Sequence, residues 1–251
     1  MPSIRLILDG AAAGDWNMAV DEALLEGAVA ANSPTLRFYG WSEPTISLGY
    51  FQPLAARARH EASRACPIVR RSTGGGAIVH DKELTYSFVL PHSAAGFAQL
   101  AGASLPLYQL FHRSLIRVLV ELGLAAEWCV PAVVKHPSDE PFLCFQRRAE
   151  GDVVIGANKV AGSAQRRHGQ ATLQHGSILL AASAAAPELS GLSELLGRPI
   201  SRETLVEAWL KKLAGELDAE FVVVELAAEE RSRTEWWRSH QFATAKWVGK
   251  R

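Results

Sequence analysis

The sequence contains few cysteines and carries no net charge, and each of these shortages excludes a class of protein. Three of its 251 residues are cysteines, namely Cys66, Cys129 and Cys144. Their long, irregular spacing matches neither a disulfide framework nor a zinc-binding pattern, so we expect no structural metal. Basic and acidic residues number 26 each. Because nucleic-acid-binding domains usually carry a clustered basic excess, we expect no nucleic-acid partner.

Long apolar runs are also absent. The chain has no uninterrupted stretch of about 18 apolar residues, so we expect no membrane-spanning helix. Its first ten residues, MPSIRLILDG, do not combine a basic lead with a long apolar segment as a secretory signal does. An odd number of cysteines without such a signal is typical of reduced thiols. We therefore expect a cytoplasmic protein that does not associate with membranes.

Apolar residues make up 48% of the chain, which is enough to bury a large core. Residues 15–31 and 107–124 have apolar side chains at helical spacing, and Asp15 is placed to cap the first of these helices. The polar segment 54–65 is also helix-like. Extended segments rich in β-forming residues occur at 4–9, 35–41, 45–52, 67–73, 83–91, 142–145, 152–167 and 171–180. After about residue 186 the pattern is mostly helical, with one further strand at 221–226.

These elements predict an α+β fold, in which mixed and antiparallel β-sheets are flanked by helices, rather than an alternating β-α-β array. The segments at 142–145, 152–167 and 171–180 are predicted to form a β-meander, with a hairpin turn at Gly156, Ala157 and Asn158. No repeat or low-complexity linker divides the chain. We therefore expect a single domain over residues 1–251.

Residues 70–81, RRSTGGGAIVHD, place three consecutive glycines between two predicted strands. The simplest interpretation is a glycine turn flanked by strands. Glycine permits positive φ angles and close approach of other groups to the backbone. Successive exposed N–H groups could bind an anion, and a flexible hairpin tip is the alternative. The segment is neither a Walker A motif, because it lacks the final Lys-Ser or Lys-Thr, nor a dinucleotide fingerprint, because it precedes a strand.

Several motifs in this order resemble the lipoate-protein ligase and octanoyltransferase superfamily, which is related to biotin protein ligases. The glycine segment is followed by GANKVAGSAQRR and HGSILL, and preceded by NMAVDEALLE and RFYGWSEPTISLGYFQ. The resemblance covers roughly residues 1–180. It implies the biotin/lipoate protein ligase catalytic-domain fold, which consists of two β-sheets with flanking helices.

The same resemblance implies a set of site residues. The lysine of the NKVAGSAQ motif, Lys159, contacts the carbonyl end of a medium-length acyl chain in this family. The residues implied to bind the acyl substrate are Arg71, Gly74, Gly75, Gly76, His80, Gly162, Ser163, Gln165, His175 and Gly176. His80 and His175 could instead be structural histidines held by hydrogen bonds. The resemblance implies no permanent cofactor and no metal.

The position of Cys144 favours one branch of the superfamily. Cys144 lies 15 residues before Lys159, as in octanoyltransferases whose cysteine stands upstream of the lysine motif and carries an acyl thioester. HDKELTYS also favours this branch, because it has Leu84 and Thr85 where ATP-using ligases carry asparagine. Gly76 departs from the pattern, since these transferases often have arginine there. On composition alone, Cys144 among apolar neighbours would more often be an inert core residue.

The chemistry of this branch predicts the partners. A thiolate is a suitable nucleophile for exchange with a thioester, and a nearby lysine favours the thiolate. The resemblance implies octanoyl-acyl carrier protein as donor. It implies a lipoyl-domain protein, such as the glycine-cleavage H protein or a dehydrogenase E2 subunit, as acceptor. We expect a monomer by default.

Three other functions remain open at this stage. One is an ATP-dependent lipoate-protein ligase, the second is an enzyme that exchanges octanoyl groups between lipoyl domains, and the third is a non-catalytic protein that binds the carrier. Dependence on ATP, on acyl carrier protein or on an octanoylated lipoyl domain distinguishes the enzymes, and absence of transfer identifies the binding protein.

Overall fold

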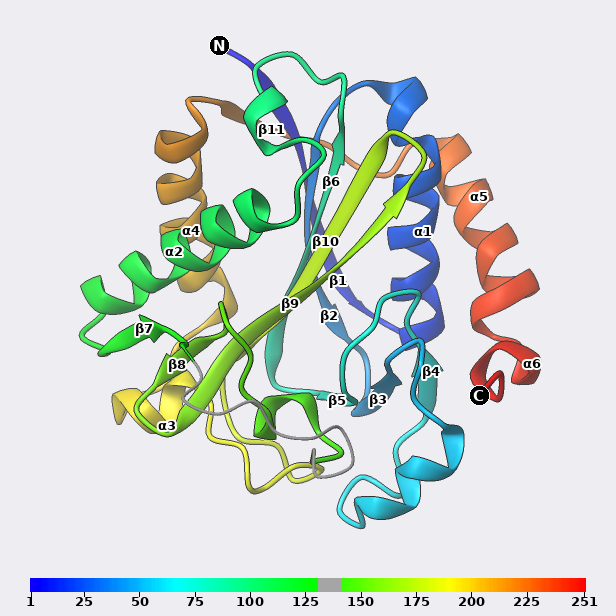
Figure 1. Ribbon diagram of the computed structural model, residues 1–251, viewed down its shortest axis with the longest axis vertical. Helices are drawn as coiled ribbons and strands as arrows, with labels where there is room; N and C mark the ends of the chain where they lie inside the picture. Colours follow the sequence, from blue (N-terminus) through cyan, green and yellow to red (C-terminus); the bar gives the residue numbers. More distant parts are fainter. Residues whose placement is uncertain (131–140) are drawn as a thin grey trace.

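The computed structural model describes residues 1–130 and 141–251. Its centre is an eight-stranded mixed sheet with the strand order β11-β1-β2-β6-β10-β9-β8-β7 (Figure 1). These strands are β1 (Ser3–Ala12), β2 (Thr35–Trp41), β6 (Glu83–Pro91), β7 (Ala126–Trp128), β8 (Val153–Ile155), β9 (Asn158–His168), β10 (Ala171–Leu179) and β11 (Glu220–Val223). A second sheet has the order β4-β3-β5 and consists of β3 (Thr45–Leu48), β4 (Ile68–Arg70) and β5 (Ile78–His80). The predicted α+β class is confirmed.

Helices cover both faces of the large sheet (Figure 1). The α-helices are α1 (Gly14–Ala31), α2 (Leu105–Glu121), α3 (Leu192–Leu196), α4 (Arg202–Leu217), α5 (Ala228–Trp237) and α6 (Ala245–Val248). Shorter 3₁₀ turns are η1 (Leu54–Arg59), η2 (Ala98–Leu100) and η4 (Cys144–Gln146), and η5 (Arg238–Phe242) is a π-helical turn. Helices α2 and α4 pack on one face of the sheet, α1 packs on the other, and α5 packs against α1.

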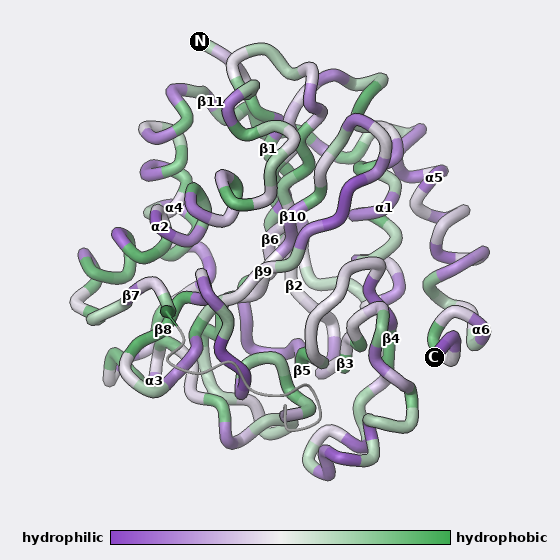
Figure 2. The backbone as a smooth tube through the Cα atoms, in the orientation of Figure 1, coloured by the Kyte–Doolittle hydropathy of each residue, from purple (hydrophilic) through white to green (hydrophobic). Residues whose placement is uncertain are grey.

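The main hydrophobic core lies between the large sheet and the helix pair α2 and α4. Trp209 of α4 is fully buried there against Phe38, Tyr86 and Phe111, and its indole N–H donates to the Ser114 hydroxyl over 2.8 Å. On the opposite face, apolar residues of α1 pack against β1, β6 and β10. The outer end of β9 is polar and exposed, and Figure 2 shows it as a hydrophilic stretch. The inner half of β9 is therefore the part that the fold encloses.

A local side-chain cap marks the start of α4 but not of α1. The Ser201 hydroxyl caps α4 by accepting a hydrogen bond from the Thr204 N–H. The prediction that Asp15 caps α1 is wrong, because the helix begins one residue earlier and its cap residue is Ala13. Asp15 lies within the first turn, where its carboxylate pairs with Arg238 at 2.9 Å. A tertiary ion pair therefore takes the place of the expected cap.

The predicted helix at 54–65 is also mostly wrong. A 3₁₀ turn covers 54–59 and the chain then continues as turns. The Arg57 guanidinium donates to the carbonyl oxygens of Arg64 and Cys66. These carbonyls are therefore satisfied by a side chain rather than by the backbone of a continuing helix.

The glycine segment does not connect two paired strands. β4 and β5 both pair with β3, in parallel and antiparallel orientation respectively, and not with each other. The segment between them crosses the end of β3, where the Tyr50 N–H donates to the Thr73 carbonyl over 2.8 Å. The predicted glycine turn is therefore a crossover between two strands that flank β3. The prediction failed because local sequence does not reveal which strands pair.

Among the described residues, no helix combines the length and the apolar character needed to cross a bilayer.

Trp209 provides a test of the main core. Replacing it with alanine should lower the free energy of unfolding by about 3–5 kcal/mol, because a large buried ring is removed and a cavity remains. Denaturant unfolding followed by circular dichroism measures this change. Trp236, 40% exposed, is the matched control, and Trp236→Ala should cost at most about 1 kcal/mol. Equal losses in the two variants would contradict this assignment of the core.

Candidate active site

Cys144 lies at the start of the η4 turn rather than in the predicted β-meander. Its N–H donates to the Ala77 carbonyl over 2.7 Å, and the Ala77 N–H donates to the Phe142 carbonyl over 3.1 Å. These bonds form an isolated parallel bridge between Ala77 and Leu143. The apolar side chains of Phe142 and Leu143 are buried against the small sheet. The predicted strand at 142–145 is therefore wrong, because these side chains fill a different core from that of the meander.

This arrangement fixes the thiol next to the glycine segment. The meander itself consists of β8, β9 and β10, as predicted for its other two segments. Lys159 is the second residue of β9, and its ammonium nitrogen lies 3.7 Å from the Cys144 sulfur and 3.4 Å from the Cys144 carbonyl oxygen. The backbone thus brings together the cysteine and lysine that the resemblance had paired.

Lys159 is a buried cation with two possible anionic neighbours. Its side chain is 4% exposed and its nitrogen lies 2.8 Å from a carboxylate oxygen of Asp152. Burial alone would lower the pKa of Lys159. The negative charges of the Cys144 thiolate and the Asp152 carboxylate outweigh burial, so the pKa of Lys159 is raised above its ordinary value. The lysine is therefore an ammonium ion at neutral pH.

Arg71 holds the glycine segment in place. Its buried guanidinium donates to the carbonyls of Gly74 and Gly76 and to both oxygens of Ser47. Burial lowers the pKa of Arg71 to about 10, which still leaves it charged at neutral pH. Gly75 has a φ of 92°, which side-chain-bearing residues adopt only with strain. Arg71 is therefore a scaffold for the segment as well as a source of positive charge.

The backbone at Gly76 is closely packed and leaves little room for a side chain. A Cβ atom at this position would lie 2.9 Å from the guanidinium of Arg147 and 3.1 Å from the Cys144 Cα. The arginine that related transferases often carry at this position is thus absent, and the Arg147 guanidinium fills the adjacent space instead. Arg147 is itself held by a 2.7 Å hydrogen bond to the Pro141 carbonyl.

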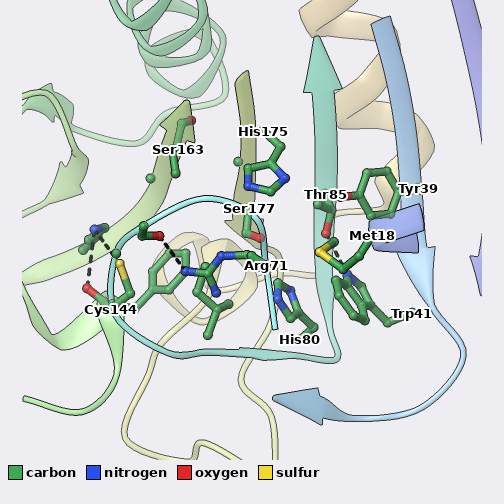
Figure 3. Close-up of a pocket in the computed structure, with 18 residues that line it drawn as sticks. Met18, Tyr39, Trp41, Arg71, His80, Thr85, Cys144, Ser163, His175 and Ser177 are labelled. Atoms are coloured by element: carbon green, nitrogen blue, oxygen red, sulfur yellow. Dashed lines mark hydrogen bonds between the residues drawn. The ribbon is translucent and has the colours of Figure 1, made fainter. Parts of the chain in front are cut away.

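A pocket lined by Cys144 and Lys159 has an empty volume of about 490 Å³, which includes space open to solvent. Figure 3 shows Cys144 at one end, and Met18, Tyr39 and Trp41 at the other. The predicted residues that line it are Arg71, Gly74, Gly75, His80, Cys144, Lys159, Gly162, Ser163, His175 and Gly176. Two predicted residues do not line it. Gly76 backs against Cys144, and Gln165 lines a neighbouring surface cavity with Gly74 and Arg166.

The polar groups of the pocket wall are bonded to one another. His80 lies 2.5 Å from both the Ser47 hydroxyl and the Glu83 carboxylate and stacks on the Trp41 ring. Burial lowers the pKa of His80 despite its carboxylate partner, so the ring is neutral at pH 7. Thr85 and Ser177 also donate to Glu83. The wall therefore offers an acyl chain mainly carbon atoms and polar groups bonded to Glu83 Oε1, while Glu83 Oε2 is buried without a hydrogen-bond partner among the described residues.

Two more polar chains tie the pocket to the surrounding fold. His175 lies 2.7 Å from the Thr73 hydroxyl and 3.1 Å from the Asp21 carboxylate, which connects the glycine segment to α1. The Ser163 hydroxyl lies 2.6 Å from His112 of α2, whose other ring nitrogen donates to the Gly151 carbonyl over 2.5 Å. Both predicted residues thus face the pocket and also hold neighbouring elements together.

Sequence reasoning missed several residues of the site. Asp152 contacts Lys159, His112 supports Ser163, and Met18, Tyr39 and Trp41 close the far end of the pocket. Met18 and Trp41 lie in motifs that the resemblance covers, but their direction into the pocket depends on tertiary packing. Asp152 offered one local signal, a carboxylate just before an apolar strand.

The described residues hold no group of three or more histidine, cysteine or acidic side chains arranged to bind a metal ion. The Cys144 thiol and the Lys159 ammonium line the pocket, and the Asp152 carboxylate contacts the ammonium. A thiol beside an ammonium ion at one end of an apolar pocket can attack an activated carbonyl, and the ammonium can stabilise the oxyanion that forms. This geometry suits acyl transfer.

Comparison with known proteins agrees with this chemistry. The model of the lipoyl protein ligase A/B catalytic domain matches residues 14–214. An octanoyltransferase LipM from Kyrpidia tusciae is 35% identical over 265 residues, which cover 94% of this chain and 94% of the relative. The octanoyltransferase LipM from Moorella thermoacetica is 35% identical over 275 residues, 98% of each chain.

Solved structures show the same fold. A bi-partite lipoate protein ligase from Thermoplasma acidophilum, described with its E2 lipoyl domain, superposes with a TM-score of 0.74 at 20% identity, covering 99% of this chain and 97% of that chain. A lipoate-protein ligase A bound with ATP has a TM-score of 0.73 at 21% identity and covers 99% of both chains. The chain therefore belongs to the lipoyl protein ligase A/B catalytic-domain family, and its curated relatives are octanoyltransferases.

Proposed function

We propose that this protein transfers an octanoyl group from octanoyl-acyl carrier protein, through a thioester on Cys144, to a lysine of a lipoyl-domain protein. The observation that carries the proposal is the pairing of the Cys144 sulfur with the Lys159 ammonium, 3.7 Å apart at one end of an apolar pocket. The octanoyltransferase activity of the relatives supports the reaction class. The donor and the covalent intermediate are our inference from the site.

In the first step the Cys144 thiolate attacks the carbonyl carbon of the donor thioester. A new C–S bond forms to Cys144, the C–S bond to the carrier breaks, and the carrier thiolate leaves and takes a proton from solvent. Negative charge builds on the carbonyl oxygen in the tetrahedral intermediate. The Lys159 ammonium stabilises that oxyanion, and no nucleotide is needed because the donor is already activated.

In the second step the neutral ε-amine of the acceptor lysine attacks the acyl-enzyme. A C–N bond forms and the C–S bond to Cys144 breaks. The nitrogen releases one proton. If the departing Cys144 sulfur takes it, the thiol is restored; if solvent takes it, the thiolate paired with Lys159 is restored. An amide replaces a thioester, which makes this step favourable.

Two adjacent positions support this transferase over an ATP-dependent ligase. Where ligases carry asparagine, Leu84 is buried in the main core and Thr85 is bonded to Glu83 and Trp41. Leu84 does not line the pocket, and the Thr85 hydroxyl, which does, is already engaged in two hydrogen bonds. The three cysteines are free thiols, which is in keeping with a reducing compartment. We propose that the protein works in the cytoplasm. We also propose that it acts as a monomer with a single domain. The archaeal ligase described with an E2 lipoyl domain supports the same class of acceptor.

The covalent intermediate is the first prediction. Mixed with octanoyl-acyl carrier protein and no ATP, the protein should gain the mass of one octanoyl group, released by hydroxylamine. Cys144→Ala should gain none, because the nucleophile is gone, whereas Cys66→Ala should be labelled like the wild type. Intact-protein mass spectrometry reads all three. Labelling of Cys144→Ala, or transfer of free octanoate that requires ATP, would contradict the proposed mechanism.

Lys159 should contribute through its charge. Lys159→Gln should reduce transfer to a lipoyl domain roughly 100-fold, because an oxyanion-stabilising donor is lost from a buried site. The exposed Lys211 on α4 gives the matched control, and Lys211→Gln should transfer at the wild-type rate. Initial rates from gel-shift or mass measurements of the octanoylated domain decide between them, and similar rates in both variants would remove Lys159 from the mechanism.

Met18 should help to set the chain length. Because it closes the far end of the pocket, Met18→Ala should improve decanoyl donors relative to octanoyl donors roughly tenfold, at about 0.8 kcal/mol for each additional buried methylene. Met18→Leu, which nearly conserves the volume, should keep the octanoyl preference. Competition between the two acyl carriers, read by mass, measures the ratio. An unchanged ratio in Met18→Ala would place the end of the acyl chain elsewhere.

A further inference from the structure

Asp152 has a role in this site that the reaction scheme above leaves unassigned. It precedes β8, is buried, and one carboxylate oxygen lies 2.8 Å from the Lys159 nitrogen. The same oxygen accepts the Ala149 N–H over 2.7 Å, which fixes the carboxylate in place. Building on the proposed function, we propose that Asp152 keeps Lys159 positively charged while Cys144 carries the octanoyl group, and so acts as the positioning residue of the second half-reaction.

The charge of the site changes when Cys144 is acylated. In the free enzyme the Lys159 ammonium lies beside the Cys144 sulfur and the Asp152 carboxylate, and the thiolate form in which Cys144 reacts places a second negative charge beside it. Acylation converts the thiolate into a neutral thioester. A buried ammonium ion without a partner is costly and tends to lose its proton. After acylation the Asp152 carboxylate is thus the anion that still contacts Lys159 among the residues that the structure describes.

The other titratable groups around Lys159 do not replace that carboxylate. Arg71 is a cation, and His112 is neutral because burial lowers its pKa. Burial raises the pKa of Tyr108 to about 12 and also raises the pKa of the Cys129 thiol, so both stay neutral. Glu188 shares a neighbouring cavity with Lys159, but its carboxylate is bonded to His60 and Gln146.

The two half-reactions therefore depend on Asp152 to different degrees. In the first, the thiolate supplies the negative charge beside Lys159, and this charge moves to the carbonyl oxygen during attack. In the second, the resting acyl-enzyme has no charge on sulfur, and the oxyanion forms only as the amine attacks. Lys159 must already be protonated at that moment, because only the ammonium form stabilises the oxyanion. Asp152 supplies the charge that keeps it so.

Asp152→Asn tests this role with little change of shape. An amide oxygen in the same place can still accept from Ala149 and Lys159, but it carries no charge. Acyl-enzyme formation from octanoyl-acyl carrier protein should stay within about threefold of the wild-type rate. Transfer from the isolated acyl-enzyme to a lipoyl domain should fall about 10- to 100-fold at pH 8. Each half-reaction is followed in a single turnover by intact-protein mass spectrometry.

The pH profile of the transfer step separates a charge effect from loss of structure. Without the carboxylate, burial lowers the pKa of Lys159 in the acyl-enzyme. The protonated lysine is the active form and is lost as the pH rises. With rising pH, the transfer rate of Asp152→Asn should therefore begin to decline at a lower pH than that of the wild type. Lowering the pH should therefore narrow the difference between the two enzymes. A purely structural defect would leave a constant ratio across pH.

Asp218→Asn is the matched control, because Asp218 is exposed at the left-handed C-cap of α4, a position that asparagine adopts readily. It should behave like the wild type in both half-reactions. Equal slowing of the two half-reactions by Asp152→Asn, or wild-type transfer at every pH, would overturn the role of Asp152. Failure of the wild type itself to form an acyl-enzyme would instead refute the proposed function, and this inference with it.

Discussion

A buried ammonium ion is stable in a protein only when negative charge lies beside it, and the site is arranged around this requirement. Lys159 is enclosed by β9, the η4 turn and the segment before β8, and each of the latter two brings it one partner. The thiol comes from a turn bonded to Ala77, and the carboxylate is held by Ala149. The glycine segment, the small sheet and the β8–β9 hairpin thus bring the Cys144 sulfur, the Lys159 ammonium and the Asp152 carboxylate together at one end of an apolar pocket (Figure 3).

The elements that follow local physical rules could be predicted from the sequence. Helices α1 and α2 have apolar residues at helical spacing, and these helices and strands β9 and β10 lie close to the predicted segments. Segment 142–145 was predicted wrongly because its apolar side chains are compatible with a strand in any sheet. Its actual partner, Ala77, lies far away in the sequence. The order β4-β3-β5 was missed for the same reason, since pairing with β3 leaves no local trace.

The site residues also fall into those that contiguous motifs predict and those that only tertiary contacts reveal. The glycine segment and the lysine motif are contiguous, so their resemblance to a known family was enough to gather most of the residues that line the pocket. Asp152 and His112 were not found, because their relation to the site is a contact and not a pattern. His112 belongs to α2, and only the packing of that helix on the sheet brings its ring to Ser163. Gln165 was included because of its motif, although its side chain faces a different cavity.

The last strand of the large sheet has a consequence for how the chain is made. β11 pairs in parallel with β1, so that Glu220 lies opposite Ser3 at the outer edge of the sheet. During synthesis, the edge of β1 that faces β11 therefore stays unpaired until residues 220–223 have left the ribosome. Exposed strand edges are sites where chains pair with the wrong partner. A nascent chain that stops before residue 220 would leave this edge of β1 open, whereas β11 covers it at Ser3–Leu6 and ends the sheet with a strand of four residues. Very short edge strands are one means by which proteins limit such mispairing.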